Sequence, residues 1–416
     1  MLTYHLLNLT GSFHSSAHEW RVTRRFVAAA KRGNMLAVTI AVLTGCTGTP
    51  PGDDSLPIEP NPDGTMSTVV GTGTAGFSGD GGPSTSAELD RPMDITVTDD
   101  RGLLIADFNQ HRVRRVELTT GTITTVAGTG ETTGVDALPS PSGVTVLSDG
   151  GFLAVAQQAH RVYQYAPDGS RSAVAGNGIG ACAAEKLDDP PLETALLQPR
   201  NVDVLADGSL LVSDQGCHRV RRIRDDVIIT YAGTGAAGYS GDGGPAVEAE
   251  MHAGPIEAGP SFGIALSPED PPDELFIADT DNHVIRQVKP FTGRIETFAG
   301  DGEPGFVDGP PDEARFNRPT HVFSGGDHSL WVVDAGNHAI RYVDPLGTRV
   351  VTVAGTGSAG FNGDGLPPDE TQLDTPTALW VTVDGTVFIA DAGNHRVRFY
   401  KSNPPPPVAS AKNKLR

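Results

Sequence analysis

The side chains best suited to chemistry in this chain are aspartate and histidine residues that recur together at a spacing of four. The pairs are Asp107/His111, Asp214/His218, Asp279/His283, Asp334/His338 and Asp391/His395, and a sixth copy has Ala156 before His160. A carboxylate beside an imidazole suits acid–base catalysis or zinc binding. Six equivalent positions cannot converge on one substrate, however, and Asp and Asn side chains readily bond to turn backbone. We therefore predict a structural role, in which Asp and Asn cap a turn and His bridges neighbouring units.

Each pair sits in a larger unit that repeats about every 50 residues, which indicates a repeat architecture. A proline opens each unit and precedes the histidine by 19 residues in five units; the prolines are Pro92, Pro141, Pro199, Pro260, Pro319 and Pro376. Short β-branched runs separated by turn residues predict four strands per unit. Four-stranded antiparallel sheets repeated around an axis form a β-propeller. The sequence thus predicts an all-β, six-bladed propeller, and residues 65–71 should close it as the outer strand of the last blade.

The Asn-His phrase, the period and the recurring Ala-Gly or Val-Gly ending resemble NHL repeats. The resemblance covers Thr65 to Tyr400 and implies the propeller fold. It implies no single function, because propellers carry unrelated activities.

A second repeated phrase, GTGTAGFSGDGGP and its relatives, joins one unit to the next. Its aspartates are Asp80, Asp242, Asp308 and Asp364, and its aromatic residues are Phe77, Tyr239, Phe306 and Phe361. The aspartates invite a calcium interpretation and the glycines a phosphate interpretation, but the ligand spacing of a calcium loop and the Lys and helix of a phosphate loop are missing. We predict glycine turns with aromatic rings that fill gaps between blades.

Residues just after each opening proline start the innermost strands and should surround the central channel. Here the repeats differ, and Asp94, Arg200, Asn201 and His321 form a candidate site for a small polar ligand. A water-filled channel without ligand is the alternative. Propellers similar to NHL repeats include zinc lyases and calcium lactonases, which implies a second alternative: a metal-dependent lyase or lactone hydrolase using His321 and Asp94. No cofactor is expected from the residues themselves, with zinc or calcium belonging to that alternative.

The chain divides into four regions by composition. Residues 1–45 combine a long basic stretch with the apolar run MLAVTIAVL, which predicts an export signal. The run ends at Leu-Thr-Gly-Cys46, which resembles a bacterial lipobox and implies a lipidated Cys46, anchored in the outer membrane if the cell is Gram-negative. Residues 46–64 read as a Pro/Gly/Asp linker, 65–402 as the propeller, and 403–416 as a disordered Pro-rich and basic tail.

Two further cysteines, Cys182 and Cys217, lie in the loop before the third unit and in a turn of that unit. Export implies an oxidising compartment, so we expect a disulfide between them. Free thiols and a metal site are the alternatives.

The charge of the chain restricts its partners. The net charge is −20, and without residues 1–45 it becomes −24, from 26 basic and 50 acidic residues. Such a surface opposes nucleic-acid binding, which requires a basic footprint. We expect a monomeric lipoprotein of the cell envelope that contacts the membrane only through its lipid and binds protein or glycan partners on the loop-rich face of the propeller. A sensor or structural envelope component is a further alternative.

Overall fold

Runs of five or six aliphatic and β-branched residues between glycine-rich turns form the short strands of the fold. The computed structural model describes residues 64–184, 189–254, 261–267, 274–325 and 329–402, together with the backbone of three strands between residues 4 and 35. The predicted lipidation site Cys46, the apolar run after Met35, most of the linker, Pro260 and the tail 403–416 lie outside the described residues.

Twenty-four strands build six four-stranded antiparallel blades. Blade one contains β5 (Pro92–Val97), β6 (Gly102–Asp107), β7 (Arg112–Glu117) and β8 (Thr122–Ala127). Blade two contains β9 (Pro141–Val146), β10 (Phe152–Ala156), β11 (Arg161–Tyr165) and β12 (Arg171–Ala175). Blade three contains β13 (Val202–Val204), β14 (Leu210–Asp214), β15 (Arg219–Arg224) and β16 (Val227–Ala232). Blade four contains β17 (Ile264–Leu266), β18 (Leu275–Asp279), β19 (Val284–Lys289) and β20 (Arg294–Ala299). Blade five contains β21 (Pro319–Ser324), β22 (Leu330–Asp334), β23 (Ala339–Val343) and β24 (Val350–Ala354). Blade six contains β25 (Pro376–Val381), β26 (Thr386–Asp391), β27 (Arg396–Lys401) and β4 (Ser67–Val70).

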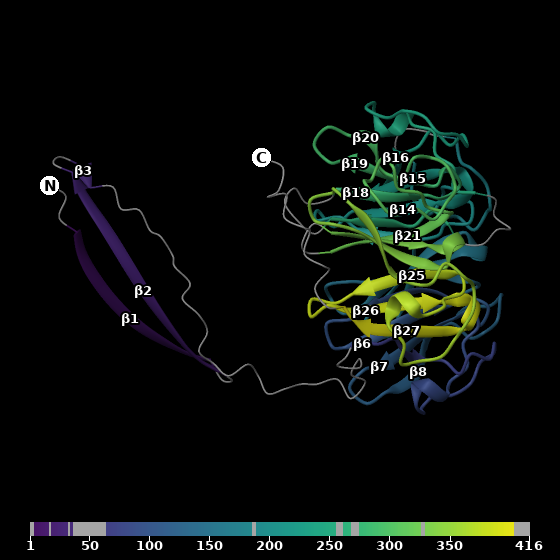
Figure 1. Ribbon diagram of the computed structural model, residues 1–416, viewed down its shortest axis with the longest axis horizontal. Helices are drawn as coiled ribbons and strands as arrows, with labels where there is room; N and C mark the ends of the chain where they lie inside the picture. The colour runs from purple at the N-terminus through teal and green to yellow at the C-terminus, as the bar shows by residue number, and fades with distance from the viewer. Residues whose placement is uncertain are drawn as a thin grey trace, which may run out of the picture. The chain divides into compact units, whose positions relative to one another are not determined.

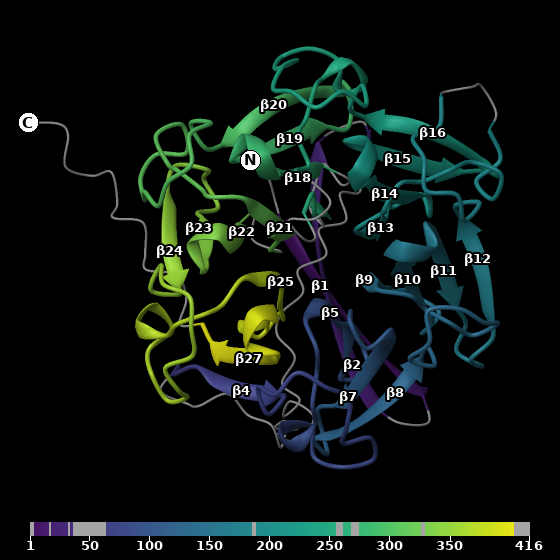
Figure 2. The same ribbon diagram turned by 90° about the vertical axis from the view of Figure 1, so that its right-hand side faces the viewer.

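The blades form a closed ring around a central axis, with the first strand of each blade innermost (Figure 2). Strand β4, from the start of the propeller, pairs with β27 and so completes the last blade. The first and last blades consequently lie side by side, with β26 and β27 next to β6 and β7 (Figure 1). The predicted six-bladed fold and its closure by an N-terminal strand are confirmed.

Short 3-10 turns accompany the strands. They are η1 (Ser84–Ser86), η2 (Gln157–Ala159), η3 (Gln215–Cys217), η4 (Ala246–Glu248), η6 (Thr280–Asn282), η7 (Ala335–Asn337), η8 (Pro368–Glu370) and η9 (Ala392–Asn394). No helix in the part of the chain that the structure describes is long and apolar enough to span a membrane.

The hydrophobic core lies between the blades. Six clusters of buried side chains occupy the six junctions of neighbouring blades in the described ring. At the closing junction, for example, Ile105 and Ile123 of blade one pack with Phe388 and Phe399 of blade six. Each blade therefore depends on both neighbours to bury its two faces, as in other repeat proteins.

A separate three-stranded antiparallel sheet lies within the N-terminal unit, residues 1–54. It consists of β1 (Tyr4–Ser15), β2 (His18–Lys31) and β3 (Asn34–Met35).

Candidate functional site

The six repeat histidines link each blade to the next. Each has a left-handed backbone, with φ between 49° and 57°, at the end of a tight turn. Their Nδ1 atoms accept backbone N–H groups of the following blade at 3.0–3.2 Å, in the pairs His111–Ser140, His160–Gln198, His218–Ala253, His283–Arg318, His338–Thr375 and His395–Arg91. An Nδ1 that accepts a hydrogen bond carries no proton, so these imidazoles are neutral and protonated on Nε2. Burial lowers the pKa of His111, His160, His218 and His283, which favours the same neutral form.

The repeat aspartates are fully buried and hold the chain just before their own blade. Their Oδ1 atoms accept backbone N–H groups at 2.7–2.8 Å, in the pairs Asp107–Asp90, Asp214–Leu197, Asp279–His252, Asp334–Asn317 and Asp391–Asp374. In the last three blades the Asn of the repeat also donates to the second carboxylate oxygen, at 2.8–2.9 Å. That same amide donates to a loop carbonyl, as Asn337 does to Gly305 at 2.6 Å. These contacts fasten the loops between blades to the turn that carries the histidine.

Four buried arginines, each seven residues after a repeat aspartate, join that aspartate to the glycine-rich loop. Arg114, Arg286, Arg341 and Arg398 are 0% exposed and lie 2.8–3.8 Å from the buried carboxylates. Their second contacts are with the loop carboxylates of Asp80, Asp242, Asp308 and Asp364, at 2.5–2.9 Å. Each loop carboxylate thus faces a guanidinium, which would repel a calcium ion from the same oxygen atoms.

The loop aromatic residues cover these arginines. The ring centroids of Phe77, Tyr239, Phe306 and Phe361 lie 4.8–5.2 Å from the guanidinium carbons, a cation–π distance. The rings stay 39–48% exposed. We had expected them to fill gaps between blades; they lie instead on the guanidinium groups, because a buried cation attracts the face of a ring.

The four predicted channel residues meet near the axis. Asp94, Asn201 and His321 come from alternate blades, one, three and five. Each lies two residues after the opening proline, where the inner strand pairs with the second strand of its blade. Asn201 Nδ2 donates to Asp94 Oδ2 at 3.3 Å, and His321 Nε2 lies 3.9 Å from Asp94 Oδ1. Gly143 and Gly263 hold the equivalent positions of blades two and four, where a Cβ would meet backbone of the following blade at 2.6–2.7 Å. Small residues between the three polar ones therefore let the inner strands approach closely.

Arg200 extends across this ring and is completely buried. Its guanidinium donates to the carbonyl oxygen atoms of Ser142, of Met93 at 3.0 Å and of Thr377 at 3.2 Å, so it connects blade three to blades two, one and six. The buried guanidinium therefore satisfies carbonyl groups of three other inner strands.

The electrostatics of the cluster follow from burial. Asp94, Asn201 and His321 are each at most 7% exposed. Burial raises the pKa of Asp94 to about 6, against the opposing effect of Arg200. Burial and the charge of Arg200 lower the pKa of His321 to about 3, so this imidazole is neutral at physiological pH. His321 Nδ1 and Arg200 Nε have no hydrogen-bond partner within the described ring.

The predicted residues thus form a closed polar cluster rather than an open pocket. Among the residues that the structure describes, no group of three or more His, Cys, Asp or Glu side chains is arranged to hold a metal ion. The pair named for the enzyme alternative, His321 and Asp94, lies inside the cluster.

Cys182 and Cys217 form a disulfide with a Cα–Cα distance of 5.5 Å. The bond ties the loop before blade three to the turn between β14 and β15. Cys217 is buried, and it replaces the Asn that braces the loop in other blades.

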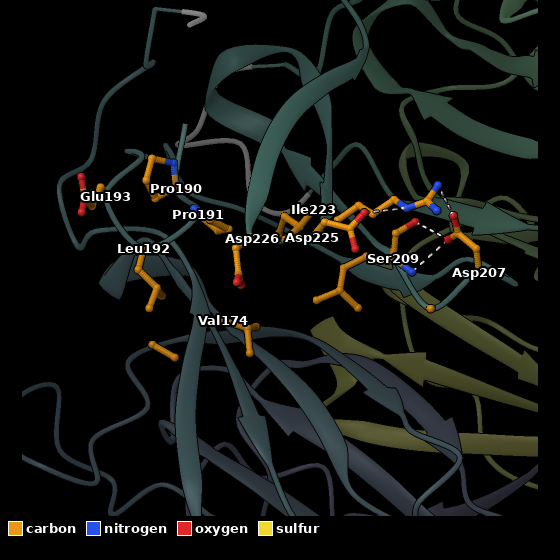
Figure 3. Close-up of a pocket in the computed structure, with 14 residues that line it drawn as sticks. Val174, Pro190, Pro191, Leu192, Glu193, Asp207, Ser209, Ile223, Asp225 and Asp226 are labelled. Atoms are coloured by element: carbon orange, nitrogen blue, oxygen red, sulfur yellow. Dashed lines mark hydrogen bonds and ion pairs between the residues drawn. The ribbon is translucent and has the colours of Figure 1, made fainter. Parts of the chain in front are cut away.

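A cavity of about 650 Å³ opens between blades two and three and was not foreseen from the sequence. Apolar walls come from β12, the segment 190–192 and β14, while four carboxylates line it: Glu193, Asp207, Asp225 and Asp226 (Figure 3). Asp207 receives Arg222 at 2.6 Å and Arg224 at 3.1 Å. A signal was present in the sequence, because the loop before blade two is the shortest of the six and lacks the Gly-Asp-Gly phrase.

Comparisons with known proteins support the repeat assignment. No protein-family model matches the chain. The chain is 25% identical over 329 residues to NHL repeat-containing protein 2 of Gallus gallus, covering 76% of this chain and 40% of the relative. It is 36% identical over 150 residues to protein Suppressor of Quenching 1, chloroplastic, of Arabidopsis thaliana, covering 34% of this chain and 14% of the relative. The chain thus spans less than half the length of either curated relative.

A solved structure shares the fold. An auxiliary nutrient binding protein of Bacteroides thetaiotaomicron is 16% identical, with a TM-score of 0.58 over 81% of this chain and 76% of that chain. The closed ring of blades is a six-bladed β-propeller, and its six histidine-linked repeats and the similarity to NHL repeat-containing protein 2 are consistent with the NHL-repeat propeller family.

Proposed function

We propose that this protein is a cell-envelope lipoprotein, anchored through Cys46, whose propeller is a binding module for protein or glycan partners. The observation that carries the proposal is the burial of the polar residues near the axis: Arg200 bonds to carbonyl groups of three other blades, and Asp94, Asn201 and His321 are at most 7% exposed, so we assign recognition to the surface. The fold neighbour from Bacteroides, described as an auxiliary nutrient binding protein, supports a binding role.

The face that carries the loops between blades suits this role. Histidine, asparagine and arginine contacts fix these loops, which reduces the conformational entropy lost when a partner binds. The half-exposed rings on this face offer apolar area with a fixed orientation, as aromatic residues do at many interfaces. The acidic surface favours partners that carry basic groups.

Photo-cross-linking in intact cells tests the binding face. A photoreactive phenylalanine analogue would replace Phe361, which is 39% exposed, in the full chain. The matched control carries the same analogue at Val383, a fully exposed residue in the turn between β25 and β26. We expect a discrete adduct, to a protein or a glycan, from position 361 and none from position 383. Equal labelling at both positions would contradict a dedicated binding face.

The anchor is tested separately by Cys46→Ser. Membrane fractions should lose the protein, and labelling with a radioactive fatty acid should disappear, while Cys182→Ser should leave both unchanged. Retention of fatty-acid label in Cys46→Ser would refute the lipoprotein assignment.

A further inference from the structure

We propose that the outer edge of β12 is a docking site for an extended, basic peptide segment of a partner protein. The segment would add a fifth strand to blade two, and its alternate side chains would face the cavity between blades two and three. This site lies on the rim of the ring (Figure 2) and is independent of the proposed loop-face function.

In the five other blades the start of the outer strand is paired with another segment of the chain. One residue at the start of each outer strand, which in blade six is the residue just before β4, points its backbone away from the blade and pairs with the preceding loop. The contacts are Ile123 with Gly81 and Gly82, Ile228 with Asp189, Ile295 with Gly243 and Gly244, Val350 with Gly309, and Met66 with Gly365 and Leu366. All five of these strand residues are 0% exposed aliphatic or Met side chains. Covering an edge in this way protects it from pairing with other chains.

Blade two breaks the rule at the same position. The register of β11 with β12 places Arg171 where the others have a buried aliphatic residue or Met. No backbone group from another segment pairs with the outward edge of β12 among the described residues, which include the whole preceding loop, 128–140. That loop is instead held by the guanidinium of Arg171, which donates to the carbonyl oxygen atoms of Ala137 and Val135. The strand edge itself is left available.

The cavity lies where side chains of an added strand would need space. Along β12, Ala173 packs toward blade one and Val174 packs toward blade three, and both residues border the cavity, in which Figure 3 labels Val174. A strand added about 4.8 Å beyond β12 would continue this alternation, so every second side chain would lie on the cavity side. Peptide recognition by strand addition uses this arrangement, in which backbone bonds give affinity and pockets give specificity.

Charge decides the occupant. Four carboxylates line the cavity; Asp207 and Asp225 pair with Arg222 and Arg224, whereas Glu193 and Asp226 have no ion pair among the described residues. The net charge of −20 opposes pairing of two copies of this chain edge to edge. An extended segment that alternates apolar and basic residues matches both the apolar wall at Val174 and Leu210 and the surrounding carboxylates.

The edge is tested by Ala173→Pro in the full chain. In the repeat geometry Ala173 lies two residues after Arg171, so its N–H also points outward and proline removes it without breaking the ladder to β11. The matched control is Thr125→Pro, the equivalent residue of β8 in blade one, where Ile123, two residues earlier, is paired with the preceding loop. Fluorescence anisotropy would measure binding of an acetylated eight-residue peptide that alternates lysine and valine.

We expect the wild-type protein and Thr125→Pro to bind this peptide with affinities within about 2-fold, and Ala173→Pro to bind it at least about 5-fold more weakly, the effect of one lost hydrogen bond. The double variant Glu193→Gln, Asp226→Asn should also weaken binding and reduce its salt dependence. A peptide with glutamate in place of lysine should bind more weakly than the lysine peptide. A lysine–valine peptide with N-methylated alternate amides should lose affinity for the wild-type protein, which tests the backbone pairing even if Ala173→Pro fails to fold.

Three results would overturn the proposal. The first is no binding of the lysine–valine peptide to wild-type protein; the second is unchanged affinity in folded Ala173→Pro or toward the N-methylated peptide. The third is a dimer in sedimentation that Ala173→Pro dissociates, because the edge would then belong to a second copy of this chain.

Discussion

Replacing Arg200 by methionine should destabilise the whole ring, because this side chain connects four inner strands. The substitution keeps an unbranched apolar stem and removes donors to three buried carbonyl groups, those of Ser142, Met93 and Thr377. An unsatisfied buried acceptor costs roughly 1–3 kcal/mol, and relief of guanidinium desolvation offsets part of the total. We expect a loss of about 3–5 kcal/mol in the free energy of unfolding.

Urea unfolding of the full chain, followed by intrinsic fluorescence and circular dichroism, measures this loss. Arg224→Met is the matched control, because its side chain is 57% exposed and pairs only with surface carboxylates. The control should change the unfolding free energy by less than about 1 kcal/mol. A second variant, Arg200→Met with Asp94→Asn, should recover part of the loss, because Asp94 would otherwise keep a buried carboxyl without its neighbouring cation.

A loss below about 1 kcal/mol for Arg200→Met would refute the reasoning, since even one orphaned carbonyl should exceed that value. It would mean that water replaces the guanidinium at these carbonyl groups. Recovery in the double variant without a loss in the single variant would likewise contradict the electrostatic account.

Three further predictions concern the links between blades. Burial lowers the pKa of His283, so on acidification the unfolded chain takes up the proton first, and the contribution of His283 to stability is present above pH 6.5 and lost as pH falls. The stability deficit of His283→Gln relative to wild type should therefore shrink between pH 7 and pH 5 in urea titrations. A constant deficit would contradict the neutral bridge. Replacing both Cys182 and Cys217 by serine opens a loop with a sequence separation of 35 and should lower the unfolding free energy by up to about 4 kcal/mol, with an unchanged urea midpoint as the contrary result. Asp334→Ala leaves a buried arginine without its buried partner and should cost about 3–5 kcal/mol, whereas Asp308→Ala, at a half-exposed partner of the same arginine, should cost about 1 kcal/mol or less; equal losses would show that burial does not set the strength of these pairs.

The fold could be predicted from the sequence because the residues that define each blade recur at regular spacing. The proline, the Asp-x-x-Asn-His phrase and the terminal glycine recur in register, so strand number, blade number and ring closure followed from spacing alone. The same regularity placed Asp94 and His321 at the axis, because an inner strand must begin at the same point in every blade. Comparing the residues at equivalent positions of the repeats was therefore enough to predict that the channel residues lie close together.

What the sequence did not predict depends on side-chain direction. Nothing in the spacing indicated that the Arg200 guanidinium would reach carbonyl groups of three other blades, since that depends on the direction of one long side chain. The loop arginine–aspartate pairs were also missed, although a signal existed. The units with a Gly-Asp-Gly loop or its relative all carry arginine seven residues after the repeat aspartate, as in Arg341 with Asp308.

Blade two shows how one exception changes several contacts at once. Its loop lost the Gly-Asp-Gly phrase, and Tyr163 replaces the arginine that would have paired with that aspartate. Without the loop to cover β12, a buried aliphatic residue at the edge would face solvent, and Arg171 stands there instead, with its guanidinium carbon 4.3 Å from the Tyr163 ring centroid. Three differences that seem unrelated in sequence thus share one physical cause, a preceding loop that does not pair with the edge of β12. A repeat that departs from its neighbours in a coordinated way still folds with them, since the interblade histidine contact from His160 is retained. The coordinated departure therefore removes only the cover of the strand edge, which is where this propeller differs from a fully protected ring.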